Sequence, residues 1–162
     1  MYNKNQLFMS KMSSVVGMLT LIACDQGLLA VLWQDEKLMD EEMCIEQDEH
    51  PILLAAKQQL QQYFLGQRQV FDVPLIMHGT AFQLQVWQAL QQIPFGQTRS
   101  YQQIAQQIGR PKAMRAVGLA NKNNPLSIIV PCHRVIGKSG KLVGFAGGLN
   151  TKQILLDLEH TI

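Results

Sequence analysis

The acidic residues of this 162-residue chain lie almost entirely in its first half. Residues 1–78 hold five Lys and Arg against ten Asp and Glu, a balance of −5, and residues 79–162 hold nine against two, a balance of +7. No acidic residue lies between Asp72 and Asp157. We therefore expect a basic half that faces a polyanion and an acidic half turned away from it, unless the charges cluster by chance.

The length gives room for one ordinary domain or two small ones, and the composition changes near His78-Gly79. We place a boundary there, which predicts domains 1–78 and 79–162. Apolar residues make up 47% of the chain and charged residues 16%, a composition that excludes a disordered tail. The fold class that we expect is α+β, with a small sheet-and-helix domain before a mainly helical one.

Three cysteines without a CxxC pair do not favour a disulfide framework and fit a reducing cytoplasm, where we expect the protein. Cys24 and Cys44 have no metal-ligand spacing and are expected to be small buried side chains. The apolar stretch 15–33 is interrupted by Asp25-Gln26-Gly27, which favours a β-hairpin over a membrane span. We also see no signal peptide and predict no membrane association.

The first domain is expected to begin with paired strands over residues 13–34. Residues 35–50 hold eight acidic residues and predict an exposed loop or the start of a helix. A helical stripe of apolar side chains covers residues 51–65, and an extended piece follows over residues 68–77.

Short helices are predicted for the second domain. Thr80 with Gln83, and Ser100 with Gln103, have the spacing of capping boxes at helix starts. A Gly-Arg-Pro break at 109–111 then separates the second helix from a third at about 112–121. Two short helices joined by such a turn form a helix-turn-helix, although an ordinary helical corner with a solvated basic face has the same pattern. As a groove-facing helix should, the third one presents basic side chains: Lys112, Arg115 and Lys122.

The segment 128–137, IIVPCHRVIG, carries the reactive chemistry. An apolar strand over 128–130 is expected to end at Pro131, which leaves Cys132 at the strand end. Only a thiolate is a strong nucleophile, and a neighbouring imidazole or guanidinium from His133 or Arg134 would lower the pKa of the thiol. A lone cysteine is more often an inert buried thiol. Its combination with Pro, His and Arg in an acid-free stretch favours a nucleophile instead.

PCHRVIG at 131–137 resembles the active-site motif of the O6-alkylguanine-DNA alkyltransferases, the methylated-DNA–protein-cysteine methyltransferases. The resemblance covers 79–160 closely and 10–78 more loosely. It implies a ribonuclease-H-like first domain and a winged-helix-like second domain with a helix-turn-helix. The matching segments occur in family order: 79–93 (GTAFQLQVWQALQQI), 100–101 (SY), 111–118 (PKAMRAVG), 124–125 (NP), 144–149 (GFAGGL) and 152–159 (KQILLDLE).

This resemblance implies that Cys132 accepts the alkyl group and that His133 takes the thiol proton through a water. Glu159 would orient His133, although a solvated helix carboxylate is the alternative. Asn124 would tie the turn after the third helix to the cysteine segment, or serve as a plain turn residue before Pro125. The arrangement is the nucleophile, base and orienting group expected of an activated thiol.

The remaining implied roles concern DNA, because the reacting carbon is reached only when the base leaves the stack. Arg115 would fill the gap or simply contact a phosphate. Tyr101 would donate to the flipped guanine or be an ordinary helix tyrosine. The other expected DNA contacts are Lys112, Ala116 and Lys122, and the expected base-pocket residues are Pro131, Val135, Phe145, Ala146 and Gly147.

Phe145 stands where many family members carry a tyrosine, and the missing hydroxyl removes one hydrogen bond worth roughly 0.5–1.5 kcal/mol. The family's structural zinc ligands are incompletely present in this chain, where only Cys24 and His78 lie near the expected positions. We therefore predict no metal. We expect a monomer that needs no cofactor. It would act once on O6-alkylguanine in duplex DNA and, by the same resemblance, on O4-methylthymine. The alternatives are a non-catalytic helix-turn-helix or lesion-flagging protein, and a cysteine hydrolase with an oxyanion hole.

Overall fold

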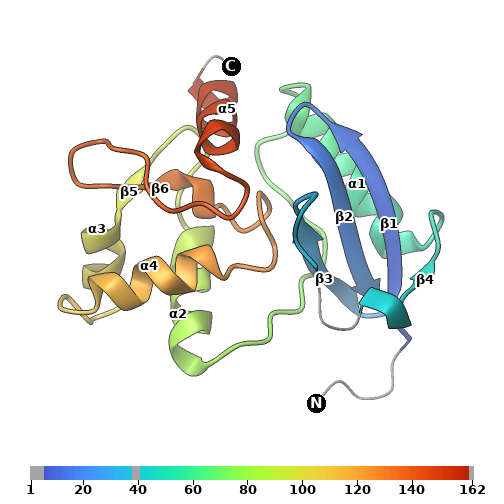
Figure 1. Ribbon diagram of the computed structural model, residues 1–162, viewed down its shortest axis with the longest axis horizontal. Helices are drawn as coiled ribbons and strands as arrows, with labels where there is room; N and C mark the ends of the chain where they lie inside the picture. Colours follow the sequence, from blue (N-terminus) through green and yellow to red (C-terminus); the bar gives the residue numbers. More distant parts are fainter. Residues whose placement is uncertain (1–5, 38–40, 161–162) are drawn as a thin grey trace. The chain divides into compact units, whose positions relative to one another are not determined.

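The computed structural model describes residues 6–37 and 41–160, and these fall into two compact units, Met1–Met77 and His78–Ile162. Each unit has its own elements, coloured in chain order in Figure 1. None of the helices in the described residues is both long and apolar enough to cross a membrane.

Unit 1 is a four-stranded sheet with one helix packed on it (Figure 1). The strand order is β3-β2-β1-β4. The pairs β1–β2 and β2–β3, formed by β1 (Phe8–Ser14), β2 (Gly17–Cys24) and β3 (Gly27–Leu32), are antiparallel. The turn at Asp25 and Gln26 joins β2 to β3, so the predicted hairpin is confirmed. Strand β1 begins earlier than the sequence pattern indicated.

The helix of unit 1 is α1 (Pro51–Phe64), and it begins at a capping histidine. Nδ1 of His50 accepts a hydrogen bond from the backbone N–H of Ile52 at 3.3 Å, and Pro51 takes the first helical position, where no N–H is needed. Four apolar side chains of this helix are fully buried: Leu53, Ala56, Leu60 and Tyr63. Their spacing is the stripe that the sequence predicted.

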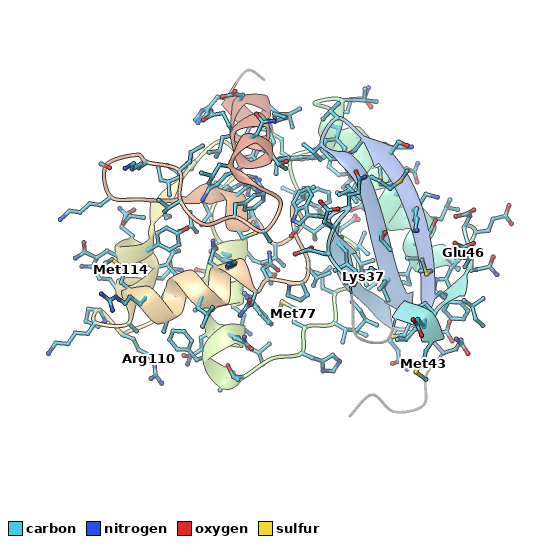
Figure 2. All side chains as sticks on the ribbon, in the orientation of Figure 1. Lys37, Met43, Glu46, Met77, Arg110 and Met114 are labelled. Atoms are coloured by element: carbon cyan, nitrogen blue, oxygen red, sulfur yellow. The ribbon has the colours of Figure 1, made fainter. Side chains whose placement is uncertain are left out.

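The acidic segment forms a short 3-10 helix η1 (Glu41–Met43) and strand β4 (Ile45–Glu46), which pairs in parallel with β1. Its residues 38–40 lie outside the described residues. Met43 and Glu46 are exposed, and both are labelled on Figure 2. The expected exposed segment therefore supplies the edge strand of the sheet and does not start the next helix.

Unit 2 is mainly helical, which confirms the α+β class. It contains α2 (Ala81–Gln91), α3 (Tyr101–Gln107), α4 (Met114–Lys122) and α5 (Leu149–His160). Both predicted capping boxes are present, at Thr80 with Gln83 and at Ser100 with Gln103. Helices α2, α3 and α4 pack on one another, and Trp87 Nε1 donates to the carbonyl of Ala120 at 2.8 Å.

Two short strands, β5 (Arg99–Ser100) and β6 (Val135–Ile136), pair in parallel and connect the start of α3 to the segment after the cysteine. This pairing brings residue 101 and residues 132–136 to one part of unit 2. Helix α5 packs on the cysteine segment, so three distant stretches of the chain meet there.

Candidate active site

The cysteine segment is folded tightly, and the strand predicted for residues 128–130 is wrong. Ile128 has a φ of 73°, a conformation that β-branched residues rarely adopt, and Cys132 begins a 3-10 helix, η2 (Cys132–Arg134). Asn124 causes this path: its Nδ2 donates to the carbonyl of Val130 at 2.8 Å, and its Oδ1 accepts from the N–H of Leu126 at 2.9 Å. The turn is therefore tied to the cysteine segment by a buried amide.

The thiol of Cys132 is buried, with 3% of the residue exposed. Burial raises the pKa of Cys132, and this effect outweighs hydrogen bonds from Asn124 and Ser127 and the charge of Lys152, which all lower it. Neither His133 nor Arg134 is among the groups that lower the pKa of the resting thiol, and the Arg134 guanidinium binds Glu159 instead. A buried thiol with a raised pKa needs a base at the moment of reaction.

The hydrogen bonds of His133 suit it to act as this base. It is fully buried, and its Nε2 lies 2.8 Å from Oε1 of Glu159. Because a carboxylate accepts, we assign the ring proton to Nε2, which makes Nδ1 the lone-pair nitrogen. Within the described part of the chain Nδ1 has no hydrogen-bond partner. Burial lowers the pKa of His133, so the imidazole is neutral and can accept a proton through Nδ1.

Arg134 holds the orienting carboxylate rather than the thiol. Its Nη2 donates to Glu159 Oε1 at 2.7 Å, its Nε donates to both carboxylate oxygens at 3.0 and 3.1 Å, and its Nη1 donates to the carbonyl of Ile93 at 2.7 Å. Burial raises the pKa of Glu159, but hydrogen bonds from His133 and Arg134 outweigh it and hold the pKa at about 2. The carboxylate is therefore charged and fixed in place.

Lys152 is a site residue that the sequence analysis did not single out. It is fully buried on α5, and its Nζ donates to the carbonyls of Val135 at 2.5 Å and Val143 at 3.2 Å. Burial lowers the pKa of Lys152 to about 8, and the charge of Cys132 acts in the opposite direction. The helical spacing of the sequence could have indicated this residue, because Lys152 lies on the same buried face of α5 as Leu155, Leu156 and Glu159.

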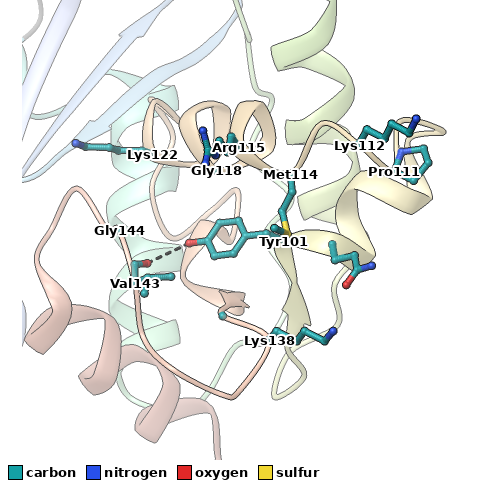
Figure 3. Close-up of a pocket in the computed structure, with 12 residues that line it drawn as sticks. Tyr101, Pro111, Lys112, Met114, Arg115, Gly118, Lys122, Lys138, Val143 and Gly144 are labelled. Atoms are coloured by element: carbon teal, nitrogen blue, oxygen red, sulfur yellow. Dashed lines mark hydrogen bonds between the residues drawn. The ribbon is translucent and has the colours of Figure 1, made fainter.

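A cavity of about 810 Å³ opens beside this cluster (Figure 3). Tyr101 lines it, is half-buried, and donates from its hydroxyl to the carbonyl of Val143 at 3.1 Å. Burial and the charge of Cys132 raise the pKa of Tyr101. The hydroxyl of Tyr101 is therefore a polar group of the cavity lining, whereas Cys132 is not among the lining residues.

Basic side chains surround the same cavity. Lys112, Arg115 and Lys122, the predicted DNA contacts around α4, all line it, and Lys138 joins them (Figure 3). Ala116 is exposed on α4 but lies outside the lining. Arg110 and Met114 of unit 2 are also exposed and are labelled in Figure 2, and Met114 belongs to the lining of the cavity.

The predicted base-pocket residues, unlike the basic ones, do not line the cavity. Pro131, Val135 and Phe145 are buried, whereas Ala146 is exposed and Gly147 is partly exposed. None of the five lines the cavity, to which their loop contributes Val143 and Gly144. Among the described residues, no three His, Cys, Asp or Glu side chains form a group that could hold a metal ion.

Two family models match this chain. The ribonuclease-like domain of 6-O-methylguanine DNA methyltransferase matches residues 7–77, and the DNA-binding domain of the same family matches residues 81–161. The chain belongs to the methylated-DNA–protein-cysteine methyltransferase family.

Curated members of this family are similar over most of their length. A methylated-DNA–protein-cysteine methyltransferase of Methanosarcina acetivorans is 49% identical over 148 residues, which is 90% of this chain and 94% of the relative. The constitutive methyltransferase of Bacillus subtilis is 47% identical over 149 residues, 90% of each chain.

Solved structures of the family have the same fold as this chain. The O6-methylguanine methyltransferase of Mycobacterium tuberculosis superposes with a TM-score of 0.90 at 44% identity, covering 96% of this chain and 94% of the other. A structure of the tuberculosis methyltransferase in complex with DNA gives a TM-score of 0.86 at 47% identity, covering 93% and 91%.

Proposed function

We propose that this methyltransferase repairs duplex DNA by moving an alkyl group from O6 of guanine to the sulfur of Cys132, once per molecule. The observation that carries the proposal is a buried thiol in the same short helix as a neutral histidine. A charged carboxylate binds Nε2 of this histidine and so leaves Nδ1 as the nitrogen that can accept a proton. Family membership supplies the reaction type, and the cavity beside Tyr101 supplies access for a base.

The proposed DNA surface is the basic rim of the cavity, with α4 as the helix that enters a groove. Lys112, Arg115 and Lys122 are exposed there and would contact phosphates or the gap in the stack. Each phosphate contact releases counterions, so DNA affinity should fall steeply as the salt concentration rises. Arg115 would occupy the space left by the extruded base, which costs a few kcal/mol to unstack.

The transfer step conserves every atom and charge. His133 takes the thiol proton through a water, the thiolate attacks the alkyl carbon, and the sulfur–carbon bond forms as the carbon–oxygen bond breaks. The electron pair of that bond stays on guanine, which receives a proton from Tyr101 and ends as the normal base. The His133 imidazolium then returns its proton through water to Tyr101, so in total one proton has moved from the thiol to guanine and both His133 and Tyr101 are restored.

Glu159, Arg134 and Lys152 would serve this step without bonding to the alkyl group. Glu159 fixes the His133 tautomer and stabilises the imidazolium that forms, as the orienting member of a nucleophile–base pair does. Arg134 keeps the carboxylate charged in a buried place. Lys152 supplies a positive charge that lowers the pKa of Cys132 and so favours the thiolate.

The thioether product is stable, so we expect one transfer per protein molecule. The lesion carries the alkyl group itself, and we propose no cofactor. A monomer would suffice, because all proposed groups come from unit 2 of one chain.

The test is incubation with a duplex oligonucleotide that carries one O6-methylguanine, followed by peptide mass analysis. We expect a gain of one methyl group on the Cys132 peptide and none on the Cys24 or Cys44 peptides. Cys132→Ala should bind the duplex as tightly as the parent and gain no mass. Unmodified Cys132 with intact DNA binding would instead support a non-catalytic lesion-binding protein, and repeated turnover would indicate a hydrolase.

A further inference from the structure

Met114 is an exposed apolar side chain among the cations of the cavity. It is the first residue of α4 and is 49% exposed, and it lines the cavity together with three basic residues: Lys112, Arg115 and Lys122. Contacts with DNA phosphates need basic or polar groups, so the basic rim does not account for a methionine there. Single exposed apolar side chains are common on protein surfaces, and the position of Met114 therefore matters more than its exposure.

Helix geometry places Met114 on the side of α4 that faces Tyr101. Gly118 lies one turn after Met114 on the same face of α4, because residues four positions apart are neighbours on a helix surface. A Cβ atom added at Gly118 would lie 3.9 Å from Cδ1 and Cε1 of Tyr101, so this face is turned to the ring. Figure 3 shows the Met114 side chain extending from α4 toward Tyr101. Met114 and Tyr101 therefore occupy adjoining parts of the cavity lining.

Met114 and Arg115 leave α4 in different directions. Consecutive helical residues are about 100° apart around the axis, since one turn holds 3.6 residues. The two side chains therefore reach different parts of a bound duplex. With Arg115 in the gap left by the extruded base, Met114 is directed to the base pair beside that gap.

We propose that Met114 is a further DNA contact: its thioether packs against the base pair next to the extruded nucleotide and hinders the return of that nucleotide to the stack. Apolar side chains, methionine included, insert between base steps of duplex DNA and partly unstack them. A thioether sulfur also makes favourable contacts with aromatic rings. The proposal rests on the proposed function, because it needs a duplex from which a base is extruded.

The first test compares two substrates in single-turnover methyl transfer: a duplex with one O6-methylguanine, and free O6-methylguanine, which has no neighbouring base pair. Met114→Ala should slow transfer from the duplex by about fivefold and from the free base by less than about twofold. Met114→Leu keeps the apolar volume and should restore most of the duplex rate. An equal decrease with both substrates would assign Met114 to the support of Tyr101, and that result or no decrease at all would overturn the proposal.

The second test detects unstacking without methyl transfer. The duplex carries 2-aminopurine, which fluoresces more when it is unstacked, next to the O6-methylguanine, and the protein carries Cys132→Ala so that the lesion persists. Binding should raise the fluorescence, and adding Met114→Ala should remove at least about half of the rise. An equal rise with and without Met114 would contradict the proposal. A parent protein that transfers no methyl group would instead remove the proposed function, so the two failures are distinguishable.

Leu119→Ala is the matched control on the same helix. Leu119 is 62% exposed and lies outside the described lining of the cavity, so this variant should keep the parental transfer rate and the parental fluorescence rise. Salt dependence separates Met114 from its basic neighbours. Lys112→Ala should reduce the slope of log affinity against log salt by about one phosphate contact, and Met114→Ala should leave the slope unchanged. A reduced slope for Met114→Ala would contradict a contact with bases.

Discussion

Each unit of this protein contains a buried histidine paired with a carboxylate, and the two pairs have similar geometry. In unit 1, Nε2 of His50 lies 3.0 Å from Asp25; in unit 2, Nε2 of His133 lies 2.8 Å from Glu159. The other ring nitrogen differs. Nδ1 of His50 already accepts the first free N–H of α1, whereas Nδ1 of His133 has no partner in the described residues.

The carboxylates differ as well. The side chain of Asp25 is 80% exposed, while that of Glu159 is 1% exposed and is also bound by Arg134. A surface pair is screened by water and contributes little, whereas a buried pair depends on complete compensation. A histidine–carboxylate pair can therefore act as a general base when one ring nitrogen is left without a partner and the carboxylate is held charged in the interior.

Neutralising each carboxylate in turn should affect methyl transfer in one unit only. Glu159→Gln should slow methyl transfer by about 10³-fold, because the general base loses its orienting charge. Asp25→Asn should leave the transfer rate unchanged. Single-turnover kinetics on a methylated duplex measure both, and a similar loss in the two variants would remove the distinction.

Arg134→Met should cost about 3–4 kcal/mol of unfolding free energy, since it leaves a buried carboxylate without its cation. Urea unfolding at neutral pH measures this cost. Lys57→Met is the matched control in unit 1, because its partner Asp48 is 79% exposed. A loss for Arg134→Met no larger than for Lys57→Met would mean that Glu159 is solvated in solution.

The pH dependence of stability separates the pairs further. The pKa of Glu159 is about 2 in the folded protein against an ordinary value of 4.5, so its contribution is present above pH 4.5 and is lost as the pH falls toward 2. This contribution is on the order of 3 kcal/mol. Urea unfolding between pH 5 and pH 2.5 should show a smaller decline for Glu159→Gln than for the parent. Parallel curves would contradict the assignment.

The smallest effect concerns His50, whose task is to cap α1. His50→Ala should lower the unfolding free energy by about 1 kcal/mol, and His50→Asn should restore most of it, since Asn is a favoured cap. Neither change should alter the transfer rate. Thermal unfolding and transfer kinetics together measure this, and slower transfer in a folded His50 variant would assign the first pair a part in the reaction.

Local sequence patterns predicted much of the fold. The two capping boxes, the stripe of α1 and the hairpin turn at Asp25 depend on residues a few positions apart, so the chain itself specifies them. The strand expected at 128–130 was wrong because hydrogen bonds from Asn124 fold that segment back. Helix α4 begins at Met114, two residues later than expected. Side-chain hydrogen bonds from a residue only a few positions away can thus override the preference of a short apolar run for a strand.

Some residues of the candidate site could likewise be predicted from the sequence, and others could not. Cys132, His133 and Glu159 were identified through the family motif, and the geometry brings His133 and Glu159 into contact. Lys152 was not recognised, because the contacts that define its role come from residues of other segments. The pKa of Cys132 was expected to fall and instead rises, since burial is a property of the folded chain that adjacent letters do not reveal.

The central claim is that His133 is a neutral imidazole with its proton on Nε2 and a free Nδ1. Nitrogen NMR of protein labelled with 15N-histidine measures the protonation state and tautomer directly, with His133→Asn identifying the signals. At pH 7 we predict the Nε2–H tautomer for His133, with Nδ1 unprotonated. An imidazolium, or a proton on Nδ1, would contradict the account, because neither form could take the proton of Cys132.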